Sequence, residues 1–273
     1  MLKYIEQVGK YFPIMQHSRH INVFVLRIIS HFKLNIMRKY PFIRVFAVMA
    51  FFVILTAFML PLNVEQNNFT GEKFSKLSIA VKSKVYIKQG PDYKLDIQAD
   101  EATLKKIEVE YESDELTIKC KSGSKINEPV TINIITPTLN EISVAGSSEL
   151  FIEKTFETSE MDLSIAGSGN MKLNDLKTEK VSASIAGSGN LMLAGGKAGS
   201  VESFSIAGSG NIDALGFTAS VVNVEIAGSG DCKVFATDKL NVSIAGSGDV
   251  YYKGKPVVNS ESAGSGKVSS LSE

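Results

Sequence analysis

One seven-residue phrase recurs seven times in the second half of this 273-residue chain, and its alanine returns every 18 to 21 residues. Three copies read S-I-A-G-S-G-N, and the other four keep the central A-G-S. A fixed period near 20 residues is typical of structural units that stack on one another. The chain therefore predicts a solenoid, and we expect its function to lie on a long surface rather than in a catalytic pocket. The copies span residues 143–149, 164–170, 184–190, 205–211, 225–231, 243–249 and 261–267.

The residues beside each phrase alternate between apolar and polar. In the copy that contains Ala166, Leu163 and Ile165 precede the alanine, and Met171 and Leu173 follow it, with polar residues between the members of each pair. This period of two indicates a β-strand on each side of the phrase. Because one such unit cannot bury its own apolar face, we expect the inward positions of successive units to form continuous apolar ladders.

The A-G-S-G segment between the two strands has no large side chain, and glycine adopts backbone conformations that other residues resist. We interpret it as a tight corner. The prediction is an all-β fold, a parallel, right-handed β-helix or solenoid of 18–21-residue A-G-S-G repeats, preceded by an N-terminal signal or transmembrane helix. A roll of repeated hairpins is the alternative topology. The predicted corner residues are Gly146, Gly167, Gly169, Gly187, Gly189, Gly208, Gly210, Gly228, Gly230, Gly246, Gly248, Asn170, Asn190 and Asn211.

The last repeat differs from the others, because it places Ser260, Ser262 and Ser270 at positions that are aliphatic elsewhere. A polar interior is typical of a terminal cap or of a fraying end. We expect weak order from about Pro256 onward.

Residues 45–62 form an uncharged apolar run that follows Arg38, Lys39 and Arg44, which is typical of a secretion signal or a membrane anchor. We divide the chain into four parts on this basis. Residues 1–36 are an N-terminal extension, which is untranslated if Met37 is the start. Residues 37–63 are the signal peptide or anchor, 72–141 the first strands and cap of the solenoid, and 142–270 the repeat β-helix.

The charged residues exclude several function classes. Residues 63–273 contain 21 lysines, no arginine, no histidine and 28 acidic residues. An acidic domain without arginine is poorly suited to nucleic acid, because phosphate neutralisation depends on clustered basic side chains. The absence of histidine removes Ser-His-Asp and Cys-His catalysis and the usual zinc sites. We expect neither catalytic nor cofactor-binding residues.

Less regular strands are expected over residues 72–141, with one helical turn at 100–106 capped by Asp100. The order F-S-K-L-S-I-A-V-K-S-K-V-Y-I-K-Q-G (74–90), L-T-I-K (116–119) and I-T-P-T-L-N-E-I-S-V-A-G-S (135–147), followed by A-G-S-G repeats, resembles the head GIN domain family of auto-transporter adhesin-like proteins. The resemblance covers residues 72–267. It implies a β-helical fold and an exported bacterial protein of the cell envelope, and little about biochemistry.

A polar position follows each repeat alanine by four residues. We interpret it as a corner ladder, in which the side chains form hydrogen bonds along the stack. The alternative is a cation site at Asp231 and Asp249, a weak metal candidate, because stacked carboxylates repel unless an ion bridges them. The period-nine motif of calcium-binding β-rolls is absent. The ladder consists of Glu149, Asn170, Asn190, Asn211, Asp231, Asp249 and Lys267.

Two other sets of side chains are candidates for ligand contact. The corner serines could present a row of hydroxyls to a glycan or peptide, although serine is also simply a small residue that a tight corner accepts. Several aromatic residues either mark a contact patch or fold over the flank of the solenoid. The serines are Ser147, Ser168, Ser188, Ser209, Ser229, Ser247 and Ser265, and the aromatic residues are Tyr93, Tyr111, Phe217, Phe235 and Tyr251.

These observations favour an exported, non-catalytic binding or structural protein of the outer-membrane surface or the periplasm of a Gram-negative bacterium. The expected partner is a glycan or a protein at the cell surface, together with the membrane itself if residues 45–62 are not cleaved. One alternative is a periplasmic β-helix enzyme that acts on polysaccharide. The other is a membrane-anchored envelope sensor or scaffold, which requires Met1 as the start.

Overall fold

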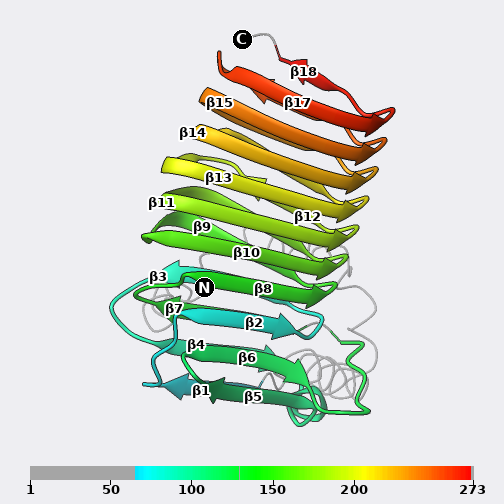
Figure 1. The fold of residues 1–273 in the computed structure, drawn as a ribbon. Helices are drawn as coiled ribbons and strands as arrows, with labels where there is room; N and C mark the ends of the chain where they lie inside the picture. The colour runs from blue at the N-terminus through cyan, green and yellow to red at the C-terminus, as the bar shows by residue number, and fades with distance from the viewer. Residues whose placement is uncertain (1–64, 129, 272–273) are drawn as a thin grey trace, which may run out of the picture. The chain divides into compact units, whose positions relative to one another are not determined.

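The computed structural model describes residues 65–128 and 130–271, which form β-strands and one short helix (Figure 1). The apolar run at 45–62 and the N-terminal extension lie outside the described residues. Within the described part, no helix is both long and apolar enough to span a membrane. The strands wind into a parallel β-solenoid, as the repeat predicts.

One face of the solenoid, the A sheet, collects the strands that lead into each corner. It contains the apolar positions that precede the repeat alanines. Its order in space begins at the N-terminal end of the stack and ends at the last repeat. The order is β5 (Ile107–Glu112), β6 (Glu115–Cys120), β2 (Lys76–Ala80), β8 (Glu141–Gly146), β10 (Glu160–Gly167), β11 (Asn170–Gly187), β13 (Gly196–Gly208), β14 (Asn211–Gly228), β15 (Cys232–Gly246) and β17 (Val257–Gly264).

A second face, the B sheet, collects the strands that leave each corner. The strands β11, β14 and β15 begin in the B sheet and end in the A sheet one turn later. The order in space is β1 (Glu65–Thr70), β4 (Lys94–Ala99), β7 (Thr131–Thr136), β3 (Lys84–Gln89), β9 (Glu149–Glu157), β11, β12 (Asn190–Leu193), β14, β15, β16 (Val250–Lys253) and β18 (Val268–Ser270).

The register between turns places like residues on like residues. Ile165 lies on Ile185, which lies on Ile206, and the alanines and first glycines of the corners align in the same way. All pairings between the repeats are parallel, so the alternative of repeated hairpins is wrong. The inward ladders form one continuous buried core.

A third face, which the sequence pattern does not reveal, closes each turn. The segments expected to be variable loops carry strand pairings, and their inward residues Phe156, Leu176 and Phe217 are completely buried. The prediction that Phe217 is an exposed contact residue is therefore wrong.

The N-terminal end of the stack is closed by antiparallel strands. β1 and β4 extend the B sheet, and β5 pairs antiparallel with β6 at the edge of the A sheet. The short helix α4 (Glu101–Leu104) lies between β4 and β5 with Asp100 as its N-cap, as predicted. The turn made by β2 and β3 lies between the turn of β6–β7 and that of β8–β9. The order of these turns in the stack therefore differs from their order along the chain.

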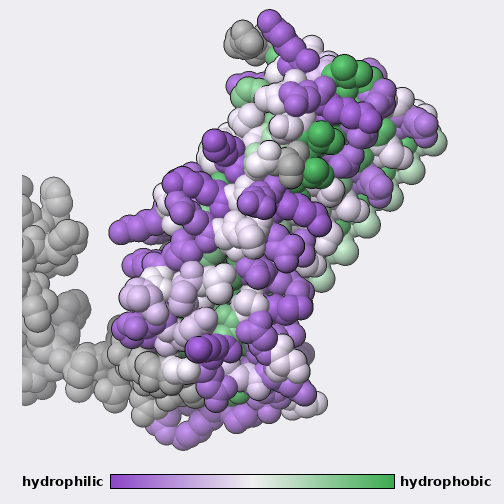
Figure 2. Space-filling model, turned by 60° about the vertical axis from the view of Figure 1, so that its left-hand side comes forward, coloured by the Kyte–Doolittle hydropathy of each residue, from purple (hydrophilic) through white to green (hydrophobic). Residues whose placement is uncertain are grey.

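The last repeat forms β17 and β18, which pair with β15 and β16, so the expectation of weak order after Pro256 is wrong for the described residues up to Leu271. The serines expected to face inward lie at the exposed end of the stack. Most of the surface in Figure 2 is hydrophilic, with hydrophobic residues gathered toward the C-terminal half. Val257 at the start of β17 is 67% exposed.

Candidate functional site

The corners between the two sheets require glycine. At Gly208 the backbone φ angle is +129°, a region that side chains disfavour, and an added Cβ would lie 2.4 Å from the carbonyl oxygen of Gly187 in the turn below. From the second corner onward, the serine amide donates to a glycine carbonyl in the preceding turn, as from Ser188 to Gly167 at 2.8 Å. Close stacking of the backbone thus brings the residues after the corners into one row.

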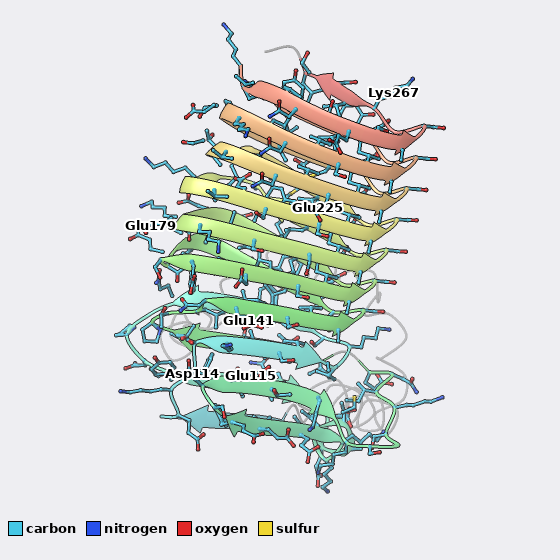
Figure 3. The ribbon with its side chains drawn as sticks, in the orientation of Figure 1. Asp114, Glu115, Glu141, Glu179, Glu225 and Lys267 are labelled. Carbon is cyan, nitrogen blue, oxygen red and sulfur yellow. The ribbon has the colours of Figure 1, made fainter. Side chains whose placement is uncertain are left out.

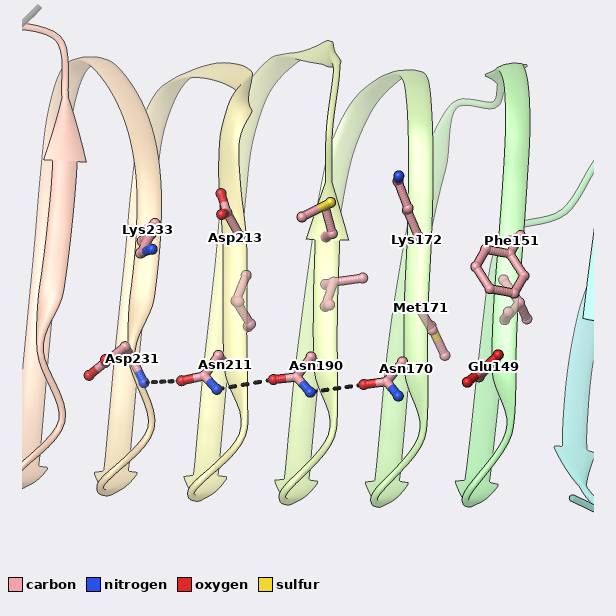
Figure 4. Close-up of a pocket in the computed structure, with 14 residues that line it drawn as sticks. Glu149, Phe151, Asn170, Met171, Lys172, Asn190, Asn211, Asp213, Asp231 and Lys233 are labelled. Atoms are coloured by element: carbon pink, nitrogen blue, oxygen red, sulfur yellow. Dashed lines mark hydrogen bonds between the residues drawn. The ribbon is translucent and has the colours of Figure 1, made fainter. Parts of the chain in front are cut away.

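That row is a directional chain of hydrogen bonds, which we call the corner ladder (Figure 4). The Nδ2 group of Asn190 donates to Oδ1 of Asn170 at 2.8 Å, and Asn211 donates to Asn190 at 3.0 Å. Beyond them the backbone amide of Asp231 donates to Oδ1 of Asn211 at 3.0 Å, and the amide of Asp249 donates to Oδ1 of Asp231 at 2.9 Å. Each side chain therefore orders its neighbour.

The two aspartates serve the same ladder as the asparagines. The amide of Lys267 donates to Oδ1 of Asp249 at 2.9 Å, and the Tyr251 hydroxyl donates to Oδ2 of the same carboxylate at 3.1 Å. This bond to Asp249 raises the pKa of Tyr251. Backbone amides and the Tyr251 hydroxyl thus donate hydrogen bonds to Asp231 and Asp249, the two carboxylates of the predicted cation site. Among the described residues, no group of three or more His, Cys, Asp or Glu side chains could hold a metal ion.

A groove of about 660 Å³ lies beside the corner ladder on the outer surface of the B sheet. Its apolar side chains are the half-buried Phe151 and Met192, which is 40% exposed, while Met171, Leu191 and Ile212 lie beneath the groove with their side chains buried in the core. The corner ladder borders one side of the groove with amides, and the other side places the apolar Phe151 and Met192 between charged side chains.

One outward row crosses the groove at right angles to the strands. Phe151, Lys172, Met192, Asp213 and Lys233 follow one another in register, and Figure 4 shows the labelled side chains of this row projecting from the same face. Successive strands lie about 4.8 Å apart, so the five residues span about 19 Å. The row contains two lysines and one aspartate, so it does not favour ligands of one charge sign.

An aromatic pair marks the end of the groove nearest the N-terminal turns. Tyr86 on β3 and Phe151 on β9 stack with ring centroids 5.4 Å apart and an interplanar angle of 21°. Both rings are half-buried, and Lys84 pairs with Glu149 beside them at 3.6 Å. Aromatic rings next to polar groups are typical of surfaces that bind ligands with both apolar and hydroxyl faces.

The other predicted contact residues do not join this groove. The corner serines are exposed along the edge of the stack, apart from the groove lining. Tyr93 and Tyr111 pack against Phe74 with centroid distances of 5.4 and 6.4 Å, in the N-terminal turns. They therefore cover the flank of the solenoid, which was the alternative to a contact patch.

A second polar surface lies on the A sheet. Asn241 donates to Asn223 at 2.8 Å and Asn259 donates to Asn241 at 3.1 Å, which makes a second amide ladder. Figure 3 shows Glu115, Glu141 and Glu225 projecting from this face, and Lys76 pairs with Glu141 at 3.0 Å. The repeat pattern contained this ladder, because the three asparagines each lie four residues before a repeat alanine.

The fold and the groove together define a class: a capped parallel β-solenoid with a ladder-lined groove on its outer surface. The chain belongs to the family described as "Putative auto-transporter adhesin, head GIN domain", whose sequence model matches residues 73–256. The expected resemblance is thereby confirmed. No curated protein matches the chain.

Solved structures share the fold. The chain is similar to a "putative adhesin" from Bacteroides fragilis, with a TM-score of 0.72 and 24% identity over 77% of this chain and 98% of that chain. A "putative adhesin" from Parabacteroides distasonis gives a TM-score of 0.64 at 22% identity, over 77% and 97% of the two chains. A "Putative lipid binding protein" from the same organism gives 0.61 at 24% identity, over 78% and 98%.

Proposed function

We propose that the chain is an exported, non-catalytic binding protein of the cell envelope, and that the groove beside the corner ladder binds a segment of an extended, hydroxyl-rich polymer such as a surface glycan. The family supports the general role of a surface protein of the adhesin type. The finer assignment to a glycan is our own.

The single observation that carries the proposal is the pairing of a continuous amide ladder with the outward apolar side chains of Phe151 and Met192 in one groove. Asn190 and Asn211 each use one N–H and one oxygen lone pair within the ladder, and Asn170 uses one oxygen lone pair. An amide has a second N–H and a second lone pair, which remain to serve a ligand. A sugar polymer offers hydroxyls along its edges and C–H groups on its ring faces, which suit the ladder and the apolar residues respectively.

The described residues also favour binding over catalysis. The charged side chains of the groove are Glu149, Lys172, Asp213, Asp231 and Lys233, without histidine, and none of its acidic residues is fully buried. A general acid needs a pKa raised by burial or by a neighbouring charge of like sign, which an open groove does not supply.

The binding test uses bacteria that display the full chain, probed with a panel of fluorescent oligosaccharides and with lipid vesicles. We expect an oligosaccharide to bind wild-type cells, and Met192→Lys to reduce its affinity at least tenfold. The matched control Val257→Lys places the same charge on exposed apolar surface outside the groove and should leave affinity unchanged. Equal loss in both variants, binding of vesicles alone, or no binding at all would overturn the glycan assignment.

The location is tested by protease treatment of intact cells, with a periplasmic protein as control. Loss of the domain would support a surface protein that meets external ligands. Protection until the outer membrane is opened would contradict adhesion and favour a periplasmic scaffold or a polysaccharide-acting enzyme.

A further inference from the structure

A glutamate lies inside the solenoid, at a position that is apolar in the neighbouring turns. The side chain of Glu202 on β13 is fully buried, and neither of its carboxyl oxygens has a hydrogen-bond partner. It lies in register with Val181 of the turn before and Val222 of the turn after. An unpaired carboxyl group in an apolar interior is costly unless it is neutral.

The groups around Glu202 offer it no counter-charge. Across the interior, the fully buried thiol of Cys232 on β15 is the titratable group that feels its charge, and burial together with Glu202 raises the pKa of that thiol. The charged side chains that flank this position are Glu179 and Lys180 on β11, Lys197 on β13, and Asp238 and Lys239 on β15, and all five are exposed to solvent. On β14 the inward neighbour of Val222 is Val224.

The backbone beside Glu202 is irregular. Opposite β11, the register of β13 shifts between the pairs Thr178–Ala198 and Lys180–Val201, so two residues of β13 face one residue of β11. Opposite β14 a second shift occurs over the same segment of β13, which contains Gly199. Such a bulge leaves backbone groups outside the regular ladder.

Ionisation of Glu202 therefore destabilises the turn that contains it more than it destabilises the other turns. Desolvation raises the pKa of Glu202 from 4.5 to about 9. A group whose folded-state pKa is raised contributes its full stability below pH 4.5 and loses it as the pH rises toward 9. In this window, each pH unit shifts the equilibrium toward states with a solvated carboxylate by up to about tenfold.

We propose that the turn formed by residues 190–208 is a pH-sensitive joint, at which the solenoid opens locally as the medium becomes alkaline and closes as it becomes acidic. Solenoid turns contact only their neighbours, so one weak turn can open while the turns on both sides stay folded. The opening lets the carboxylate reach water through the bulge, while Cys232, which pairs with Ile212 beyond the neighbouring turn, stays buried.

Hydrogen exchange and thiol labelling of the full chain test the joint between pH 6 and pH 8.5. A Cys120→Ser background leaves Cys232 as the single thiol. We expect exchange protection in residues 201–206 to fall at least tenfold more over this range in the wild type than in Glu202→Gln, each compared at equal pH to cancel the intrinsic rate. Cys232 should stay unlabelled and residues 161–167 should keep their protection in both proteins, since both lie outside the opening turn.

Glu202→Val copies the residue of the neighbouring turns and provides a second variant if the glutamine variant does not fold. Identical pH dependence of protection in the wild type and in either folded variant would overturn the proposal. So would simultaneous loss of protection in residues 161–167, because that result means global unfolding rather than opening at one joint.

Discussion

Single residues decide how closely the turns can stack. The corner glycines combine positive φ angles with backbone contacts to the turn below, but they do not do so equally. Gly146 has a φ of +92° with no heavy atom within 4 Å of an added Cβ, whereas Gly208 has both the strained φ and the close carbonyl of Gly187. The pair therefore separates backbone strain from steric overlap.

We predict that Gly208→Ala lowers the free energy of unfolding by about 3–5 kcal/mol, as the sum of strain and overlap. Gly146→Ala should cost about 1–2 kcal/mol, since only the strain applies. Urea unfolding followed by circular dichroism measures both. Equal costs for the two variants would show that overlap with the turn below does not limit the corner.

Glu202 is the second residue with a measurable effect of its own. We predict that Glu202→Val raises the free energy of unfolding by about 3 kcal/mol at pH 7, because the wild type must keep a carboxyl group protonated 2.5 units above its ordinary pKa of 4.5. The sign follows from the raised pKa: the gain should grow between pH 4.5 and pH 9 and disappear below pH 4.5. A gain that stays constant with pH would contradict the buried acid and indicate better packing alone.

At the scale of strands, the sequence predicts the regular turns well. Leu163, Ile165, Met171 and Leu173 face the core as their alternation requires, because all members of a ladder share the same spacing from a repeat alanine. The third face was missed because its loops vary in length, so Phe156 and Leu176 do not share that spacing. The position of the β2–β3 turn was also beyond reach, since pairing between distant strands depends on the whole stack.

The candidate site likewise has one part that the sequence predicts and one part that it does not. The corner ladder could be read from the repeat, because Asn170, Asn190 and Asn211 recur at one offset. The groove could not, since it depends on side chains such as Met192 and Phe151 that break the pattern on the outer face. The sequence does contain a signal for Glu202, because the residue five positions before the repeat alanine is apolar in the neighbouring repeats.

The corner ladder yields a prediction at the strand scale. Asn190→Asp keeps the oxygen that accepts from Asn211 but removes the donor to Asn170, so we expect a loss of about 1–2 kcal/mol at pH 7. Below the ordinary pKa of an aspartate the protonated carboxyl regains a donor, and the difference from the wild type should shrink. Thermal unfolding at pH 7 and pH 3.5 measures this difference. A difference that is unchanged at low pH would mean that the donor to Asn170 contributes nothing.

At the scale of the whole molecule, the solenoid is a one-dimensional stack with unlike ends. The N-terminal end is closed by antiparallel strands and α4, while the C-terminal end exposes the edge of β17. Stability in such a stack is the sum of the turns and of the interfaces between neighbours. The last turn has one neighbouring turn and presents exposed serines, so it contributes less than an inner turn.

Removal of residues 256–273 tests this view. We predict that the shortened chain folds, with a lower unfolding midpoint and an m value reduced in proportion to the surface that one turn buries. An inner deletion of residues 187–207, which removes one whole repeat and joins Ala186 to Gly208, is the matched comparison. It should also fold, but it removes Glu202 and should abolish the alkaline loss of stability that the end deletion retains. Loss of all β-structure in the end deletion would show that β17 and β18 are an essential cap.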